Sequence, residues 1–209
     1  MTIWFATGNT HKKAELAAIL RDHEIRIPAD AGIDFDPEET GGTFLENALI
    51  KARALYRLAL ETGRGGKGKP DPVIADDSGL CVDALGGRPG IYSARYGSEG
   101  CKKLDAAERN ALLLDELGDN PNRKARFVCA MVLLFSEDRF FIVQETLEGE
   151  IISRAEGKRG SGGFGYDPIL WLPELGRTVA ELSEEEKNRI SHRGKAGRRI
   201  AGILMPAPL

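Results

Sequence analysis

Two long apolar segments in the middle of the chain, at about residues 125–135 and 139–148, are separated by only Ser136, Glu137 and Asp138. Both segments are rich in β-branched and aromatic residues, which is typical of strands. A link this short joins consecutive strands as a hairpin, because a parallel pair needs a crossover of a dozen or more residues. The sequence therefore predicts one antiparallel pair in the middle of the chain.

Around this pair, short apolar runs alternate with amphipathic segments. Thr43 and Glu46 form a capping-box pattern, which predicts that a long helix begins after Thr43. We expect strands at 3–6, 25–27 and 73–75, and further helices at about 11–21, 105–117 and 191–204. This order predicts an α/β fold with a long mixed sheet flanked by helices.

Composition limits the class of protein. With 209 residues, one domain (1–209), or one domain with a smaller lobe, is expected, and the net charge of -3 argues against a chain that coats nucleic acid or an anionic membrane. The three cysteines form no CxxC pair, which argues against a disulfide framework or a structural zinc site. No apolar run approaches the ~20 residues of a membrane span, and the start MTIWFATGN lacks a basic leader, so we expect a cytoplasmic protein.

The segment IADDSGL, residues 74–80, places Asp76 and Asp77 side by side at the predicted end of a strand. Adjacent carboxylates raise each other's pKa, and a divalent cation relieves that repulsion. Magnesium takes hard oxygen ligands, usually one or two carboxylates plus substrate phosphates. A solvated turn of Asp, Ser and Gly explains the same residues equally well.

Two further segments have residues suited to phosphate or metal binding. TGNTHK, residues 7–12, lies between a strand and a helix, where backbone N–H groups and a helix N-terminus favour an anion. It lacks the spacing of a Walker A loop, and a plain turn fits as well. In PEETG, residues 37–41, Glu38 and Glu39 offer carboxylates, although acids before a helix are common for structural reasons. Asn47 and Lys51, four apart, share a face of that helix.

Near the C-terminus, GGFGYDP (162–168) combines glycines with two aromatic side chains, Phe164 and Tyr166, on which a base can stack. The stretch from Lys187 to Arg199 is basic and contains no acid. The start of the last helix, His192 and Arg193, suits a base carbonyl or a phosphate. A Gly-rich turn and a solvated basic face are the structural alternatives, and a nucleic-acid-binding module is disfavoured by the acidic overall charge.

Taken in order, these motifs resemble the inosine triphosphate pyrophosphatase family, also called Ham1-like. The matching segments are ATGNxxK, EETGxTFxENAxxKA, IADDSGLxVDALGGxPGIYSARY, GGFGYDPI and AELxxEEKNxISHRxxA, which together run from residue 6 to residue 196. The resemblance implies a mixed sheet with two α/β lobes and a cleft between them, a homodimer, and Mg²⁺-dependent hydrolysis of a nucleoside triphosphate to the monophosphate and pyrophosphate. The implied substrates are non-standard purine nucleotides, ITP, dITP and XTP.

The resemblance also implies site residues. Asp77 is the expected catalytic residue, which activates water, and the expected metal ligands are Glu38, Asp76 and Asp77. The expected triphosphate contacts are Thr7, Gly8, Asn9, Thr10, His11, Lys12, Lys51, Ser78 and Lys187. The expected base and sugar contacts are Phe164, Gly165, Tyr166, Asp167, His192 and Arg193.

Some questions stay open at the level of sequence. Donors that meet a 6-oxo group would be left unpaired by the adenine amine, at a cost of ~1–3 kcal/mol, but rejection of guanine needs a further device that the sequence does not show. A pyrophosphatase for modified pyrimidine or thymidine triphosphates is an alternative within the same chemistry. A nucleotide sensor without catalysis is the alternative from another class, and the acids Glu38, Asp76 and Asp77 argue against it. The Gly- and Lys-rich segment 63–72 is interpreted as a surface insertion.

Overall fold

The computed structural model describes residues 1–62, 70–98, 103–156, 159–160 and 162–205. Most of the segment 63–72 and also Cys101 therefore lie outside the described residues. The strands are β1 (Thr2–Phe5), β2 (Glu24–Arg26), β3 (Val73–Val82), β4 (Lys124–Ser136), β5 (Arg139–Ile151), β6 (Leu170–Leu172) and β7 (Arg177–Thr178). The α-helices are α1 (Thr10–Ile19), α2 (Phe44–Glu61), α3 (Ala106–Leu117), α4 (Glu184–Ile190) and α5 (His192–Leu204).

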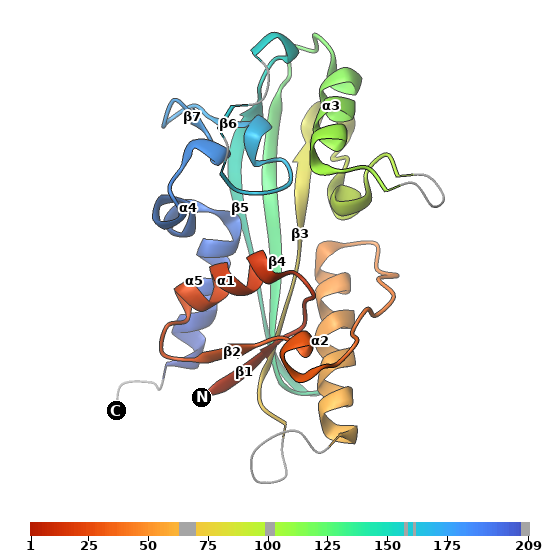
Figure 1. The fold of residues 1–209 in the computed structure, drawn as a ribbon, viewed down its shortest axis with the longest axis vertical. Helices are drawn as coiled ribbons and strands as arrows, with labels where there is room; N and C mark the ends of the chain where they lie inside the picture. The colour runs from red at the N-terminus through yellow and green to blue at the C-terminus, as the bar shows by residue number, and fades with distance from the viewer. Residues whose placement is uncertain (63–69, 99–102, 157–158, 161, 206–209) are drawn as a thin grey trace. The chain divides into compact units, whose positions relative to one another are not determined.

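The strands form one sheet in the order β2-β1-β3-β4-β5-β6-β7 (Figure 1). β1 pairs in parallel with both β2 and β3, whereas β6 pairs antiparallel with β5 and β7. β4 and β5 are neighbours joined by Glu137 and Asp138 alone, as expected for a hairpin. The predicted α/β fold with a mixed sheet is confirmed.

The chain divides into two compact units. Unit 1 comprises residues 1–77, 129–145 and 192–209, and unit 2 comprises residues 78–128 and 146–191. The division falls within β3, between Asp77 and Ser78, and within β4 and β5.

Unit 1 has a hydrophobic core on each face of its strands. Ile3 and Phe5 of β1 pack in one core with residues of α1 and α5, whereas Trp4 and Ala6 pack in the other with residues of α2. Figure 1 shows α1 and α5 on one side of these strands and α2 on the other. Because successive side chains of a strand point to opposite faces, strands covered on both sides are apolar at every position.

The prediction for residues 76–79 was wrong in one respect. The strand expected at 73–75 continues through Asp76, Asp77, Ser78 and Gly79 to Val82, so the motif is part of β3 and not a turn. The apolar stretch Val73–Ala75 is too short for its sequence pattern to predict that the strand continues to Val82. The acids are accommodated inside a strand because charged side chains from neighbouring helices meet them, which only the tertiary structure shows.

Helix ends follow the local signals closely. Thr43 caps α2 by accepting from the Glu46 N–H, while the Glu46 carboxylate accepts from the Gly42 N–H. Ser183 and Glu186 form the complete capping box at α4. In the described part of the chain, no helix is both long and apolar enough to cross a membrane.

Candidate active site

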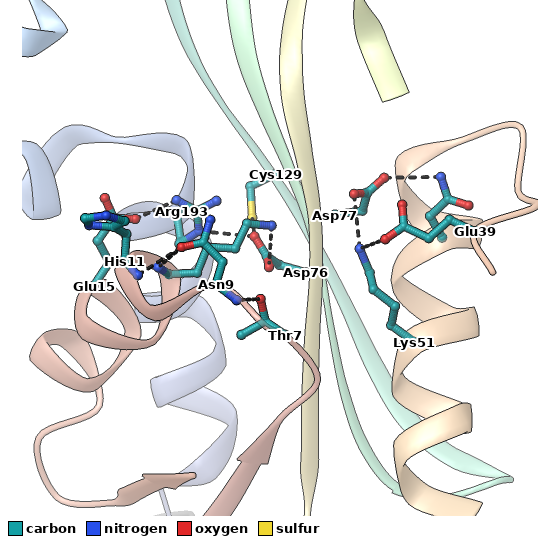
Figure 2. Close-up of polar contacts among 12 residues, drawn as sticks. Thr7, Asn9, His11, Glu15, Glu39, Lys51, Asp76, Asp77, Cys129 and Arg193 are labelled. Carbon is teal, nitrogen blue, oxygen red and sulfur yellow. Dashed lines mark hydrogen bonds and ion pairs between the residues drawn. The ribbon is translucent and has the colours of Figure 1, made fainter. Parts of the chain in front are cut away.

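The two adjacent aspartates of β3 point in opposite directions. Ile74 lies in the core under α1 and α5, and Ala75 lies in the core under α2. The alternation of the strand therefore places Asp76 on the side of α1 and α5, and Asp77 on the side of α2. Figure 2 shows the two carboxylates on either side of β3.

Asp76 is held by two cations. Lys12 Nζ donates to its Oδ1 at 2.9 Å, and Arg193 Nε donates to its Oδ2 at 3.1 Å. Only 1% of Asp76 is exposed. Burial alone raises the pKa of this carboxyl, but the charges of Lys12, Arg193 and Lys51 outweigh it and hold the pKa far below its usual range. Asp76 is therefore a buried carboxylate that is ionised at neutral pH and paired with two cations.

Glu15 completes this ionic cluster. Its carboxylate accepts from Arg193 Nη1, so the buried guanidinium bridges α1 and β3 from its position near the start of α5. Burial lowers the pKa of Arg193, but Asp76 and Glu15 more than compensate and raise it. The buried thiol of Cys129 lies 3.9 Å from Asp76 Oδ2, and burial together with Asp76 raises its pKa to about 12, so it is an unreactive thiol.

Asp77 meets a different set of partners on α2 (Figure 2). Lys51 Nζ donates to Asp77 Oδ1 at 3.2 Å and to Glu39 Oε1 at 2.8 Å. Asn47 Nδ2 donates to Asp77 Oδ2 at 3.3 Å, and Asn47 Oδ1 accepts from the Gly41 N–H at 2.8 Å. Asn47 therefore ties the loop before α2 to the carboxylate.

The electrostatic environment of Asp77 and Glu39 differs from that of Asp76. Burial, followed by repulsion from Glu39, raises the pKa of Asp77 despite the opposing charge of Lys51. For Lys51, burial lowers the pKa, but Asp77, Asp76 and Glu39 outweigh it and raise it. One ammonium thus serves two carboxylates, and Asp77 is a carboxylate able to accept a proton.

Glu39, and not Glu38, lies in this group. The side chain of Glu39 is half-buried against Lys51, whereas Glu38 is exposed. The described residues contain no cluster of three or more His, Cys, Asp or Glu side chains arranged to hold a metal. Two convergent carboxylates, Asp77 and Glu39, are the donor set that magnesium accepts when phosphate oxygens supply the remainder. The metal roles expected for Glu38 and Asp76 stay predictions, and the geometry favours Glu39 beside Asp77.

The loop from Thr7 to Lys12 has an ordered backbone with its own hydrogen bonds. Asn9 caps α1, and its Oδ1 accepts from the N–H groups of His11 and Lys12 at 2.9 and 3.2 Å. Thr7 Oγ1 accepts from the Asn9 N–H at 3.1 Å. A phosphate bound to the His11 and Lys12 amides would replace the Asn9 carbonyl as their acceptor. A side chain at Gly8 would meet no atom within 4 Å, so the outer side of this loop is open.

In unit 2, the predicted base-binding segment is organised around Asp167. Its Oδ2 accepts from the Phe164 N–H at 2.7 Å and from Lys187 Nζ at 2.9 Å. Lys187 Nζ also lies 4.6 Å from the centroid of the Phe164 ring, in cation–π geometry. Gly163 has φ of 71°, and a Cβ there would lie 2.1 Å from Asp167 Oδ2, so only glycine fits.

The expectation that Tyr166 offers a stacking face is not met. Tyr166 is buried in the hydrophobic core of unit 2, and its hydroxyl donates to the Ser93 carbonyl at 3.0 Å. Burial raises the pKa of this hydroxyl. Tyr166 was misjudged because its ring is needed by the core, which the sequence does not show, whereas Phe164 is half-buried.

The remaining predicted residues divide between the units. Lys51, His192 and Arg193 lie in unit 1, while Ser78 and Lys187 lie in unit 2. Sequence reasoning missed Glu15 altogether, because its partner Arg193 is 178 residues away. The helical spacing of Asn47 and Lys51 gave a usable signal, since both side chains reach Asp77.

Comparison with known proteins agrees with this architecture. The model of the Ham1 family matches residues 3–203. A Treponema denticola protein named dITP/XTP pyrophosphatase is 52% identical over 196 residues, which is 94% of each chain. A Geobacillus kaustophilus protein of the same name is 49% identical, over 93% of this chain and 89% of its own. The structure of the Staphylococcus aureus Ham1 protein matches with a TM-score of 0.81 and 38% identity, over 98% of both chains.

Proposed function

Because the chain belongs to the Ham1 family, we propose that it hydrolyses non-standard purine nucleoside triphosphates, dITP, ITP and XTP, to the monophosphate and pyrophosphate. The names of its relatives support the substrate class. This activity keeps such nucleotides out of DNA and RNA.

The observation that carries the proposal is the group formed by Asp77, Lys51 and Glu39. Hydrolysis of a phosphoanhydride needs a water made nucleophilic and a developing negative charge that is neutralised. A carboxylate with a raised pKa accepts a proton from water more readily than an ordinary one. Lys51 keeps its proton beside it and offers positive charge to a phosphate.

We propose Mg²⁺ as the cofactor, held by Asp77 and Glu39 together with substrate phosphates. When bound, such an ion polarises the phosphoryl oxygens and offsets their charge. Asp77 would orient and deprotonate water, Asn47 fixes the orientation of the Asp77 carboxylate, and Lys51 balances the charge of Asp77 and Glu39. The loop from Thr7 to Lys12, together with Ser78, is the proposed further contact for the triphosphate.

For the base, we propose recognition by the segment from Phe164 to Asp167, with His192 and Arg193. Lys187, which the resemblance places among the triphosphate contacts, lies against Asp167 and Phe164, so we propose it as a base contact instead. The half-buried ring of Phe164 is suited to stacking, and the Lys187 ammonium, held by Asp167, is suited to donating to a 6-oxo group. Adenine offers an amine at that position and would leave the donor unpaired, at a cost of ~1–3 kcal/mol.

We also propose a homodimer, which the resemblance of the sequence implies, and a cytoplasmic location. In the part of the chain that the structure describes, Cys81 and Cys129 are free thiols, which is compatible with a reducing compartment. Sedimentation analysis of the purified chain tests the dimer.

The direct test is pyrophosphate release from dITP, XTP, ATP, GTP and dTTP, measured with magnesium and with a chelator. We expect metal-dependent turnover of dITP and XTP, and little turnover of the others. Preference for dTTP or modified pyrimidine nucleotides would contradict the purine assignment while keeping the chemistry. Tight binding of dITP without turnover by folded protein would instead favour the nucleotide sensor.

A further inference from the structure

Helix α3 holds the predicted base-binding segment through a residue that no motif indicated. Asn110 Nδ2 donates to the Gly165 carbonyl oxygen at 3.1 Å, across 55 residues of sequence. The Asn110 side chain comes from the same helix as the core residues Leu113, Leu114 and Leu117. Only 6% of Asn110 is exposed, so it is an amide placed beside a hydrophobic core.

The other half of this amide is unsatisfied. Within the described residues, Asn110 Oδ1 is buried and has no hydrogen-bond partner. A buried acceptor without a partner is destabilising, and an apolar side chain at this position would avoid that cost. The useful contribution of Asn110 is therefore its bond to Gly165.

The backbone of Gly165 explains why its carbonyl needs a fixed donor. Gly165 has φ of 64°, although a Cβ there would meet no atom within 4 Å, so glycine is required by conformation and not by space. On one side is Phe164, whose N–H is held by Asp167, and on the other is Tyr166, whose hydroxyl is held by Ser93. The Asn110 bond fixes the peptide between these two anchored residues.

We propose that Asn110 is a positioning residue for purine-base recognition: its bond to the Gly165 carbonyl sets the orientation of Phe164 against the base. This inference rests on the proposed function and adds a residue to it. Asn110 belongs to unit 2 and takes no part in the Asp77 group of unit 1. Its loss should therefore weaken selection of the base and leave the chemistry at the triphosphate unchanged.

The experiment compares Asn110→Ala and Asn110→Asp with the wild-type chain on two substrates, dITP and methyl triphosphate, which has no base. Loss of the bond should raise KM for dITP and lower its kcat/KM roughly tenfold. kcat/KM for methyl triphosphate should stay unchanged, and the Kd of the product dIMP, measured by calorimetry, should rise in parallel with KM. Asn120→Asp makes the same chemical change at an exposed residue and should alter neither value.

Gly165→Ala perturbs the backbone of the residue that accepts the hydrogen bond and keeps the Asn110 side chain. It therefore tests the positioning role if the Asn110 variants fold poorly. It should change the ratio of dITP to methyl triphosphate turnover in the same direction. An equal loss on both substrates, or unchanged dIMP binding in folded variants, would overturn the positioning role. Failure of the wild-type chain to hydrolyse dITP would instead contradict the proposed function itself.

Discussion

Asp76 and Asp77 are adjacent in the chain, yet their carboxylates lie on opposite faces of β3 and have pKa values shifted in opposite directions. Asp76 is neutralised by Lys12 and Arg193, while Asp77 shares Lys51 with Glu39. The two carboxylates therefore face different partners, although they are neighbours in the sequence. Asp76 is a buried, ion-paired carboxylate, whereas Asp77 is the carboxylate that we propose as the general base.

Replacement of Asp77 should reduce turnover strongly and leave the fold intact. Asp77→Asn keeps the shape of the side chain, and the amide oxygen can still accept the hydrogen bond from Asn47. The variant lacks the carboxylate that we propose as the general base. We expect kcat to fall by about 10²–10⁴, the range for loss of general-base catalysis. Stability should stay close to wild type, since burial disfavours the Asp77 charge. Pyrophosphate release and thermal unfolding check the two parts, and retained turnover would exclude Asp77 as the base.

Replacement of Asp76 should mainly affect stability. Asp76→Asn leaves the buried Arg193 without its full counter-charge, which costs about 3–5 kcal/mol for a broken buried pair. The folded pKa of Asp76 lies below its ordinary value of 3.8, so its charge stabilises the fold above that pH, and this stability is lost as the pH falls through the folded pKa.

Urea unfolding at several pH values measures this effect. The wild-type free energy of unfolding should fall below about pH 4, and the variant should show a weaker fall over the same range. Equal pH dependence in both proteins would mean that Asp76 does not carry the stabilising charge.

The two glutamates before α2 should differ in their effect on metal use. Glu39→Gln removes a carboxylate that converges with Asp77 on Lys51, so the magnesium concentration for half-maximal activity should rise about tenfold or more. Glu38→Gln, at the exposed neighbouring residue, is the matched control and should change this magnesium concentration little. The reverse result would restore Glu38 as the ligand, as the sequence motif implied.

The acid limb of the pH profile should move with the charges around Asp77. Under the proposed role of Asp77 as general base, turnover needs its deprotonated form, so the raised pKa of Asp77 limits activity on the acid side. Lys51→Met removes the opposing positive charge, which raises the pKa further and shifts the limb of kcat/KM to higher pH. Glu39→Gln removes a repelling charge, which lowers the pKa of Asp77 and should shift the acid limb of kcat/KM to lower pH. Limbs that move in the same direction in both variants would contradict this account.

Two neighbouring glycines should respond differently to alanine. A Cβ at Gly41 would lie 2.6 Å from Glu46 Cβ and 2.7 Å from Asn47 Oδ1, so the loop must shift and carry Glu39 away from Lys51. A Cβ at Gly42 would lie 3.5 Å from Glu46 Oε2, an ordinary contact. We expect Gly41→Ala to lose most of its turnover and Gly42→Ala to keep it, as measured by pyrophosphate release.

The local elements could be predicted from the sequence because their causes are local. The caps at Thr43 and Ser183, the hairpin link at Glu137–Asp138 and the alternation of short strands with helices depend on residues close together in the chain. The order of the motifs likewise indicated the family, and it marked Asp77, Lys51 and the segment from Phe164 to Asp167 as candidate site residues.

Only the tertiary structure shows which partners surround each charged side chain. The role of Asp76 depends on Lys12 and Arg193, which lie 64 and 117 residues away, and that of Gly165 depends on Asn110. Whether a carboxylate is neutralised or reactive follows from burial and from the charges within a few ångströms of it. Burial and nearby charges are not encoded in the spacing of neighbouring residues. The sequence therefore identified the charged groups, and the packing of helices against β3 determined which of them are paired.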